Sequence, residues 1–122
     1  MNRDQLAQLE VGDLITVTRG IDKGIIAKVI GFSEEVDSGR KYSADYWNPV
    51  TRRYGFYDKY GTGKFKTEEE ILAAGYRRLD RGLVLEAIDP TIIFNGVKSA
   101  LLSKDRKQRI LSYEVCKPLQ QD

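Results

Sequence analysis

The sequence predicts an α+β domain that is mostly β, with one amphipathic helix at about 67–81 and a β segment after it. Three observations favour this class. Apolar and polar residues alternate over residues 11–32 with the period of a β-strand. Strand-favouring aromatic residues gather between turn residues in the middle of the chain, and residues 67–81 have helical spacing. The 122 residues suit one compact domain, which we expect to span 1–122, with a β core at 11–66 and the helix and C-terminal strands at 67–122.

Residues 3–10 carry two leucines at helical spacing and predict one or two helical turns, which would need tertiary packing because so short a helix is marginal alone. Residues 11–32 then predict a β-hairpin. Ile15 and Val17 lie two apart and point to one face of a strand. Two glycines before the second strand supply the positive-φ freedom that a sharp reversal needs. The charged residues expected at the exposed tip are Arg19, Asp22 and Lys23.

The middle of the chain predicts a loop and then two strands. Residues 33–41 are polar and contain a glycine, which is typical of an exposed loop. Residues 41–47 and 52–60 are rich in aromatic residues and flank Asn48 and Pro49, a pair that favours a turn. Glycines at 55, 61 and 63 predict irregular backbone in part of the second strand.

The expected helix begins after Thr67, whose hydroxyl can cap the first free amides while Glu70 reaches back in a capping box. Acidic residues at 68–70 complement the positive end of the helix dipole. Gly82 is a plausible stop. The stripe expected to face the core consists of Ile71, Leu72, Tyr76 and Leu79.

The C-terminal third predicts further strands. Residues 83–88 form a short apolar run bracketed by Gly82 and an Asp-Pro pair, which favours a strand. Residues 91–102 fit either two strands joined at Asn95-Gly96 or one helix, and we favour the hairpin because a central glycine costs a helix about 1 kcal/mol. Residues 110–115 predict a last strand, and 117–122 a polar tail.

Basic and aromatic residues are interleaved in the middle of the chain. The whole chain has a net charge of only +2, but residues 40–66 hold seven basic residues against two acidic ones. The same stretch contains eight of the twelve aromatic residues. Lysine and arginine neutralise phosphates, and aromatic rings offer stacking surfaces for bases. The stretch therefore indicates nucleic-acid binding, although aromatic rings also commonly fill the core of small β domains.

Other chemistries find little support in the sequence. The chain has no histidine, and no pair of carboxylates, lysines or tyrosines forms a recognisable catalytic motif, so we expect no enzyme and no cofactor. Residues 61–64 are similar to part of a phosphate loop, but Asp58 and Phe65 stand where the motif needs glycine and serine or threonine. Cys116 has no second cysteine or histidine to form a disulfide or a zinc site with. No membrane span or secretory signal is evident, and we expect a cytoplasmic protein with no small-molecule substrate.

Residues 11–32, VGDLITVTRGIDKGIIAKVIGF, resemble the KOW motif, an element shared by certain ribosomal proteins and NusG-type transcription elongation factors. Gly12-Asp13 precedes the alternating Ile15 and Val17, Gly20 and Lys23-Gly24 follow, and Val29 precedes another apolar residue. Ala27 stands where the motif usually has a second glycine. The resemblance implies an SH3-like, partly open barrel whose hairpin loop contacts RNA or a protein partner. Small barrels host many unrelated roles, so the fold alone does not establish function.

We therefore expect a non-enzymatic protein that binds RNA or a ribonucleoprotein and serves as an accessory factor in translation or transcription. The alternative is a protein–protein interaction module, such as a small regulator of a host machine or a component of a viral or cellular assembly, which would bind through an exposed strand edge or its aromatic residues. The salt dependence of binding distinguishes these two hypotheses, because contacts to phosphates make the affinity fall steeply as the salt concentration rises. The candidate binding residues are Arg19, Asp22, Lys23, Arg40, Lys41, Arg52, Arg53, Tyr54 and Tyr57.

Overall fold

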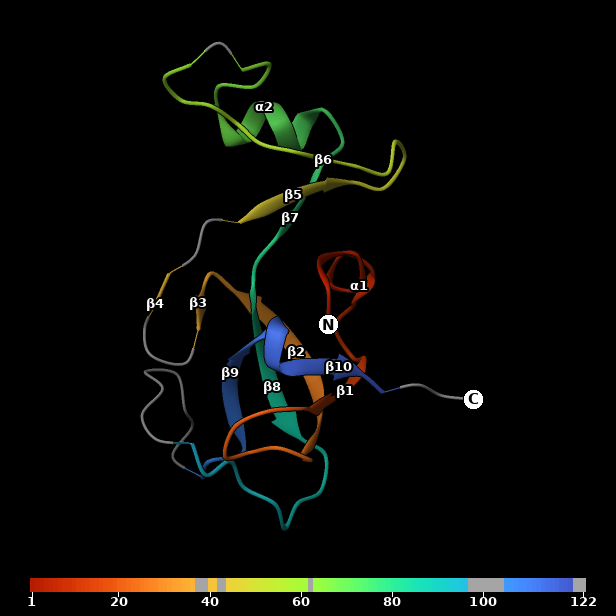
Figure 1. Cartoon of the computed structure of the whole chain (residues 1–122), viewed down its shortest axis with the longest axis vertical. Helices are drawn as coiled ribbons and strands as arrows, with labels where there is room; N and C mark the ends of the chain where they lie inside the picture. Colours follow the sequence, from red (N-terminus) through yellow and green to blue (C-terminus); the bar gives the residue numbers. More distant parts are fainter. Residues whose placement is uncertain (37–39, 42–43, 62, 97–104, 120–122) are drawn as a thin grey trace. The chain divides into compact units, whose positions relative to one another are not determined.

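The computed structural model divides the chain into two compact units (Figure 1). It describes residues 1–36, 40–41, 44–61, 63–96 and 105–119. Unit 1 comprises Met1–Tyr42 together with Arg81–Asp122, and unit 2 comprises Ser43–Asp80. Each unit is mostly β, and each contains one α-helix, so the α+β, mostly β class is confirmed. The single-domain assignment stays a prediction.

Unit 1 is built on a five-stranded antiparallel sheet with the strand order β10-β1-β2-β8-β9. Its strands are β1 (Leu14–Val17), β2 (Ile26–Ser33), β8 (Gly82–Ala87), β9 (Gln108–Ser112) and β10 (Cys116–Pro118). The two edge strands, β9 and β10, are joined in the chain by the 3-10 helix η1 (Tyr113–Val115). In a flat sheet these edges would lie about 19 Å apart, whereas three 3-10 residues rise only about 6 Å. The sheet must therefore curl strongly, but its strands do not close into a barrel.

The expected hairpin over residues 11–32 is confirmed as β1 and β2. Ile15 and Val17 are buried and alternate with half-buried neighbours, as the period-2 pattern predicts. Ala27, the departure from the KOW pattern, is a fully buried strand residue paired with Ile15, so the alanine does not disturb the hairpin. Gly20 and Gly24 between the strands adopt positive φ angles of 88° and 95°.

A short helix also packs in unit 1, as expected from residues 3–10. Helix α1 (Arg3–Gln8) begins at Asn2, whose side chain accepts a hydrogen bond from the Gln5 amide while the Gln5 side chain accepts one from the Asn2 amide. Its Leu6 is buried in the core. The helix is thus held by a reciprocal cap and by tertiary packing, which a six-residue helix requires.

The expected exposed loop at 33–41 is wrong in part. Strand β2 extends to Ser33, and β3 (Glu35–Val36) pairs antiparallel with β4 (Arg40–Lys41). Val36 is buried. A two-residue ladder is too short to leave a periodic signal in the sequence, which is why the polar composition suggested a loop instead.

Unit 2 contains a three-stranded antiparallel sheet with the order β6-β5-β7 and one helix. Its elements are β5 (Asp45–Asn48), β6 (Arg53–Gly55), α2 (Glu68–Ala73) and β7 (Arg77–Leu79). The predicted turn after Asn48 is confirmed, since β5 and β6 are a hairpin with Asn48 paired to Arg53. Strand β6 ends at Gly55, well short of residue 60, consistent with the glycines in this stretch.

The helix expected at 67–81 is much shorter. Thr67 caps α2 as predicted, but the Glu70 carboxylate accepts a hydrogen bond from the Lys66 amide rather than completing the box at Thr67. The helix ends because Gly75 adopts a φ of 95° and the Tyr76 amide reaches back to the Ile71 carbonyl, a left-handed C-terminal cap. Residues 77–79 instead form β7 and pair with β5, so the predicted stop at Gly82 is wrong.

The C-terminal predictions are met in part. The strand at 83–88 is confirmed as β8, and the strand at 110–115 is divided between β9 and η1. Part of the expected polar tail at 117–122 belongs to β10. Of the 91–102 stretch, residues 97–102 lie outside the described residues, and residues 91–96 form neither helix nor strand. Among the described residues, no helix is long and apolar enough to cross a membrane.

Candidate nucleic-acid interface

Two of the three predicted tip residues of the β1–β2 hairpin are exposed. Lys23 and Arg19 lie at the surface of unit 1. The Arg19 guanidinium donates a hydrogen bond of 2.8 Å to the carbonyl of Glu114, which ties it to η1. Lys23 is therefore the more accessible of the two cations for a ligand.

The prediction that Asp22 is exposed is wrong, since only 3% of its surface is accessible. Its carboxylate pairs with the guanidinium of Arg109, itself 5% exposed, and accepts hydrogen bonds from the amides of Asn95 (2.6 Å) and Gly96 (3.2 Å). A side chain at Gly96 would collide with the Arg109 guanidinium, so the close approach requires glycine. These contacts give Asp22 a structural role within unit 1.

The predicted residues Arg40 and Lys41 form β4 in unit 1, where their backbone pairs with β3. Their side chains lie outside what the structure describes. The other predicted residues, at positions 52, 53, 54 and 57, all lie in unit 2.

Arg52 and Arg53 are both exposed at the β5–β6 turn of unit 2. The Asn48 side-chain oxygen accepts hydrogen bonds from the amides of Val50 (2.9 Å) and Thr51 (3.2 Å), and the Arg52 amide donates to the Asn48 carbonyl. Arg52 closes the turn with a φ of 58°, in the left-handed region. The hydrogen-bonded turn thus presents two arginines that are consecutive in the sequence at a solvent-accessible corner.

Tyr54 and Tyr57 are partly committed to packing within unit 2. The Tyr54 ring lies 4.6 Å from the Trp47 ring, and the Tyr57 ring makes an edge contact at 5.8 Å with Tyr46. The Tyr46 hydroxyl donates to the Glu68 carboxylate, and burial together with this hydrogen bond raises the pKa of Tyr46. These contacts favour a scaffolding role for the four rings over a stacking one.

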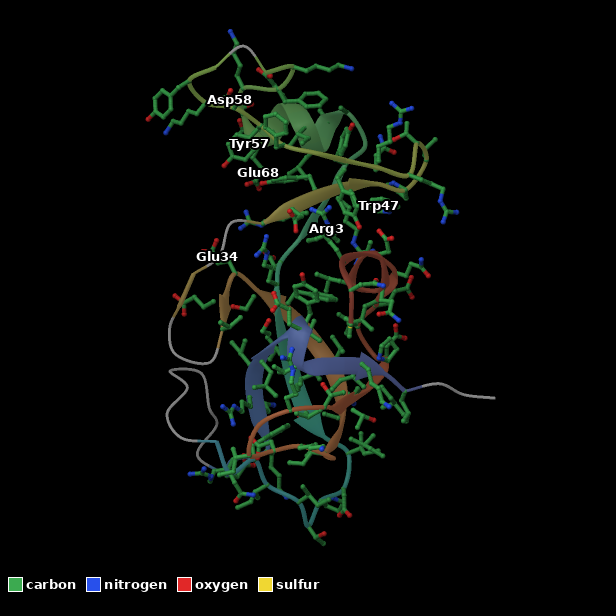
Figure 2. The ribbon with its side chains drawn as sticks, in the orientation of Figure 1. Arg3, Glu34, Trp47, Tyr57, Asp58 and Glu68 are labelled. Atoms are coloured by element: carbon green, nitrogen blue, oxygen red, sulfur yellow. The ribbon has the colours of Figure 1, made fainter. Side chains whose placement is uncertain are left out.

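Sequence reasoning missed the most exposed rings of unit 2, Phe56 and Tyr60, which are 69% and 91% exposed. They belong to a segment that we call the aromatic loop, residues 56–66 without Thr62, which lies outside the described residues. Figure 2 labels Tyr57 and Asp58 within this loop and Trp47 on β5. The same loop carries exposed lysines at positions 59, 64 and 66. The glycine at 55 was the available signal, because β6 ends there and leaves Phe56 and Tyr60 outside the strand.

Unit 1 also contains a mostly apolar cavity of about 480 Å³ next to the hairpin tip. Its lining includes Val17, Arg19, Ile21, Asp22, Val36 and Leu111. Among the described residues, no group of acidic, cysteine or histidine side chains is arranged to hold a metal ion. Cys116 is fully buried, which raises the pKa of its thiol to about 12 and makes it a poor nucleophile at neutral pH.

Comparison with family models, with curated proteins and with solved structures finds no match to this chain. The functional argument therefore rests on the residues and their arrangement.

Proposed function

We propose that the protein is a non-enzymatic nucleic-acid-binding accessory protein of translation or transcription, acting on RNA or a ribonucleoprotein. The observation that carries this proposal is the surface of unit 2, where Arg52 and Arg53 are exposed at one turn and lysines accompany exposed rings in the aromatic loop. Cations supply phosphate contacts and rings supply base contacts, which are the two ingredients of nucleic-acid recognition.

We further propose that the sheet of unit 1 is an SH3-like, KOW-type fold. Two features support this assignment. The edge strands β9 and β10 are consecutive and joined by η1, so the curled sheet brings its last strand beside β1. The glycines of the KOW-like pattern at positions 12, 20 and 24 all have positive φ angles, which only glycine adopts readily.

The function is tested by measuring binding of a fluorescein-labelled mixed-sequence RNA by anisotropy at several salt concentrations. The wild-type protein should bind at micromolar concentrations or below, and its affinity should fall steeply with salt. The double variant Arg52→Glu with Arg53→Glu should bind more weakly and lower the slope of log K against log salt by about 1.4, which is 0.7 for each lost phosphate contact on a single strand.

The matched control reverses two exposed charges on unit 1, Lys23→Glu with Lys117→Glu. Both double variants change the net charge equally, so a purely global electrostatic effect would weaken them alike. We expect the control to retain more affinity. The absence of any salt-sensitive binding would refute the proposed function, and the opposite order of the two variants would move the site to the hairpin tip.

A second candidate function is protein–protein interaction, favoured by exposed isoleucines in unit 1. Their positions are Ile21, Ile88, Ile92 and Ile93. Exposed large apolar side chains beyond isolated ones are typical of docking sites. A pull-down from nuclease-treated extract should then retain a defined protein partner, whereas loss of every partner after nuclease treatment would favour nucleic-acid binding.

A further inference from the structure

Hydrogen bonds constrain the described residues of the aromatic loop of unit 2. The Asp58 amide donates to the Phe65 carbonyl at 2.7 Å and closes the loop. The Asp58 carboxylate accepts hydrogen bonds from the amides of Tyr60 (3.1 Å) and Gly61 (2.8 Å). A Cβ at Gly61 would clash with this carboxylate unless the Asp58 side chain moved. These hydrogen bonds constrain the backbone at Tyr60 and Gly61.

Both ends of the aromatic loop are anchored by ring contacts. Phe65 makes an edge contact with Tyr76 at 5.6 Å, and Tyr57 makes one with Tyr46 at 5.8 Å. Tyr46 is in turn hydrogen-bonded to Glu68, which also pairs with Arg78 at 2.9 Å. A fixed loop loses less conformational freedom on binding than a mobile one.

The anchored loop leaves its remaining rings open to solvent beside cations. Tyr60 is 91% exposed, and the Lys59 ammonium lies 5.9 Å from the centre of its ring. The Lys64 ammonium lies 5.6 Å from the half-buried ring of Phe65. A single exposed ring is ordinary on a protein surface. Here two exposed rings, Phe56 and Tyr60, share one loop with three exposed lysines, which is the composition of a stacking platform beside a phosphate track.

We infer that the aromatic loop makes the protein selective for single-stranded nucleic acid, with Tyr60 stacking on an unpaired base while Lys59 and Lys64 contact neighbouring phosphates. This inference rests on the proposed function and names its ligand class. In a duplex the faces of each base are covered by the neighbouring base pairs, so an exposed ring cannot stack on them. An unpaired base has a free face on which the ring can stack. Duplex binding would have to rely on the cations alone.

The test compares a labelled single-stranded 12-mer, as RNA and as DNA, with the duplex of the same sequence at one salt concentration. The variants are Tyr60→Ala and, as the control that keeps the ring, Tyr60→Phe. Tyr60→Ala should weaken single-strand binding about 5- to 150-fold, which corresponds to the 1–3 kcal/mol of one stacked base. The Tyr60→Phe variant should bind the single strand with an affinity close to that of the wild-type protein. A 2-aminopurine in the strand should lose fluorescence on binding wild type and lose less on binding Tyr60→Ala.

The ring carries no charge, so Tyr60→Ala should leave the slope of log K against log salt unchanged, whereas Lys59→Glu with Lys64→Glu should lower it. Because Tyr60 is almost fully exposed, the variants should fold normally, which circular dichroism verifies. Preference for either single strand over the duplex, lost in Tyr60→Ala, supports the inference. Equal binding of strand and duplex overturns it while leaving the proposed function standing, and no binding to either overturns both.

Discussion

Asp22 joins three segments of unit 1 through one buried carboxylate. It lies in the connection between β1 and β2, contacts the backbone at residues 95 and 96, and pairs with Arg109 on β9. Charges taken out of water are tolerated only when they are paired and hydrogen-bonded, and here both conditions hold. The same contacts fix the hairpin tip on which Lys23 is exposed.

Removing either partner should destabilise the fold strongly, because the other charge is then buried without compensation. We expect Asp22→Ala and Arg109→Met each to lower the free energy of unfolding by about 3–5 kcal/mol. The double variant should lose well under the sum of the two. Urea denaturation followed by far-UV circular dichroism measures these changes. A loss below about 1 kcal/mol for each single variant would show that the pair contributes little.

At the scale of the element, the β1–β2 hairpin requires glycine at Gly24 and merely accepts it at Gly31. Gly24 has a φ of 95° and nothing within 4 Å of where a Cβ would lie, so only the backbone demands glycine there. Gly31 in β2 is outside the positive-φ region, and a Cβ would lie 3.8 Å from Val84, an ordinary contact. Substituting these two glycines therefore distinguishes the effect of backbone strain from the effect of side-chain packing.

Gly24→Ala should therefore destabilise the protein by about 1–2 kcal/mol, the cost of a left-handed non-glycine residue. Gly31→Ala should be neutral or stabilising by up to about 1 kcal/mol, because alanine reduces the freedom of the unfolded chain. Thermal unfolding of the two variants provides the comparison. Equal losses from both would mean that crowding and not the φ angle governs the hairpin.

The elements that could be predicted are those whose signals are local. The hairpin follows from alternation between Ile15 and Val17, and the start of α2 follows from the Thr67 cap. The end of α2 could not be predicted from the sequence, because residues 77–79 continue the helical spacing. They form β7 only because they pair with β5, a strand distant in the sequence. Tertiary pairing here overrides local propensity.

The candidate site was predictable in composition but not in geometry. The basic and aromatic stretch can be recognised in the sequence. The alternation of residue types along it does not show that Tyr54 packs on Trp47 or that Tyr60 is exposed. The burial of Asp22 depends on partners 73 to 87 residues away in the sequence, and no local pattern reports such contacts.

Across the whole molecule, the two units differ in how much apolar surface they bury. Unit 1 holds most of the fully buried side chains among the described residues, including Leu83 and Leu85 on the interior strand β8, whereas unit 2 relies on Tyr46, Ile71 and Leu79. Local opening is easiest where few apolar contacts oppose it.

Amide hydrogen exchange should therefore be slowest in β2 and β8 and clearly faster in β5, β6 and β7. The slowest amides of unit 1 should report global unfolding, and those of unit 2 should exchange through a lower-energy partial opening. Mass spectrometry of proteolytic fragments or NMR measures both sets in one sample. Identical protection in the two sheets would indicate that the chain opens as one cooperative body.

The pairing of Ser33 with Gly82 has a consequence for how such a protein could change over time. These residues lie at the end of β2 and the start of β8, so the sheet itself joins the two ends of residues 34–81, the stretch that contains Ser43–Asp80. Lengthening a connection whose ends are already joined costs only about 0.6 kcal/mol for each doubling. The insert can thus be replaced or remodelled while the sheet keeps its register, and related chains could share the scaffold yet recognise different ligands.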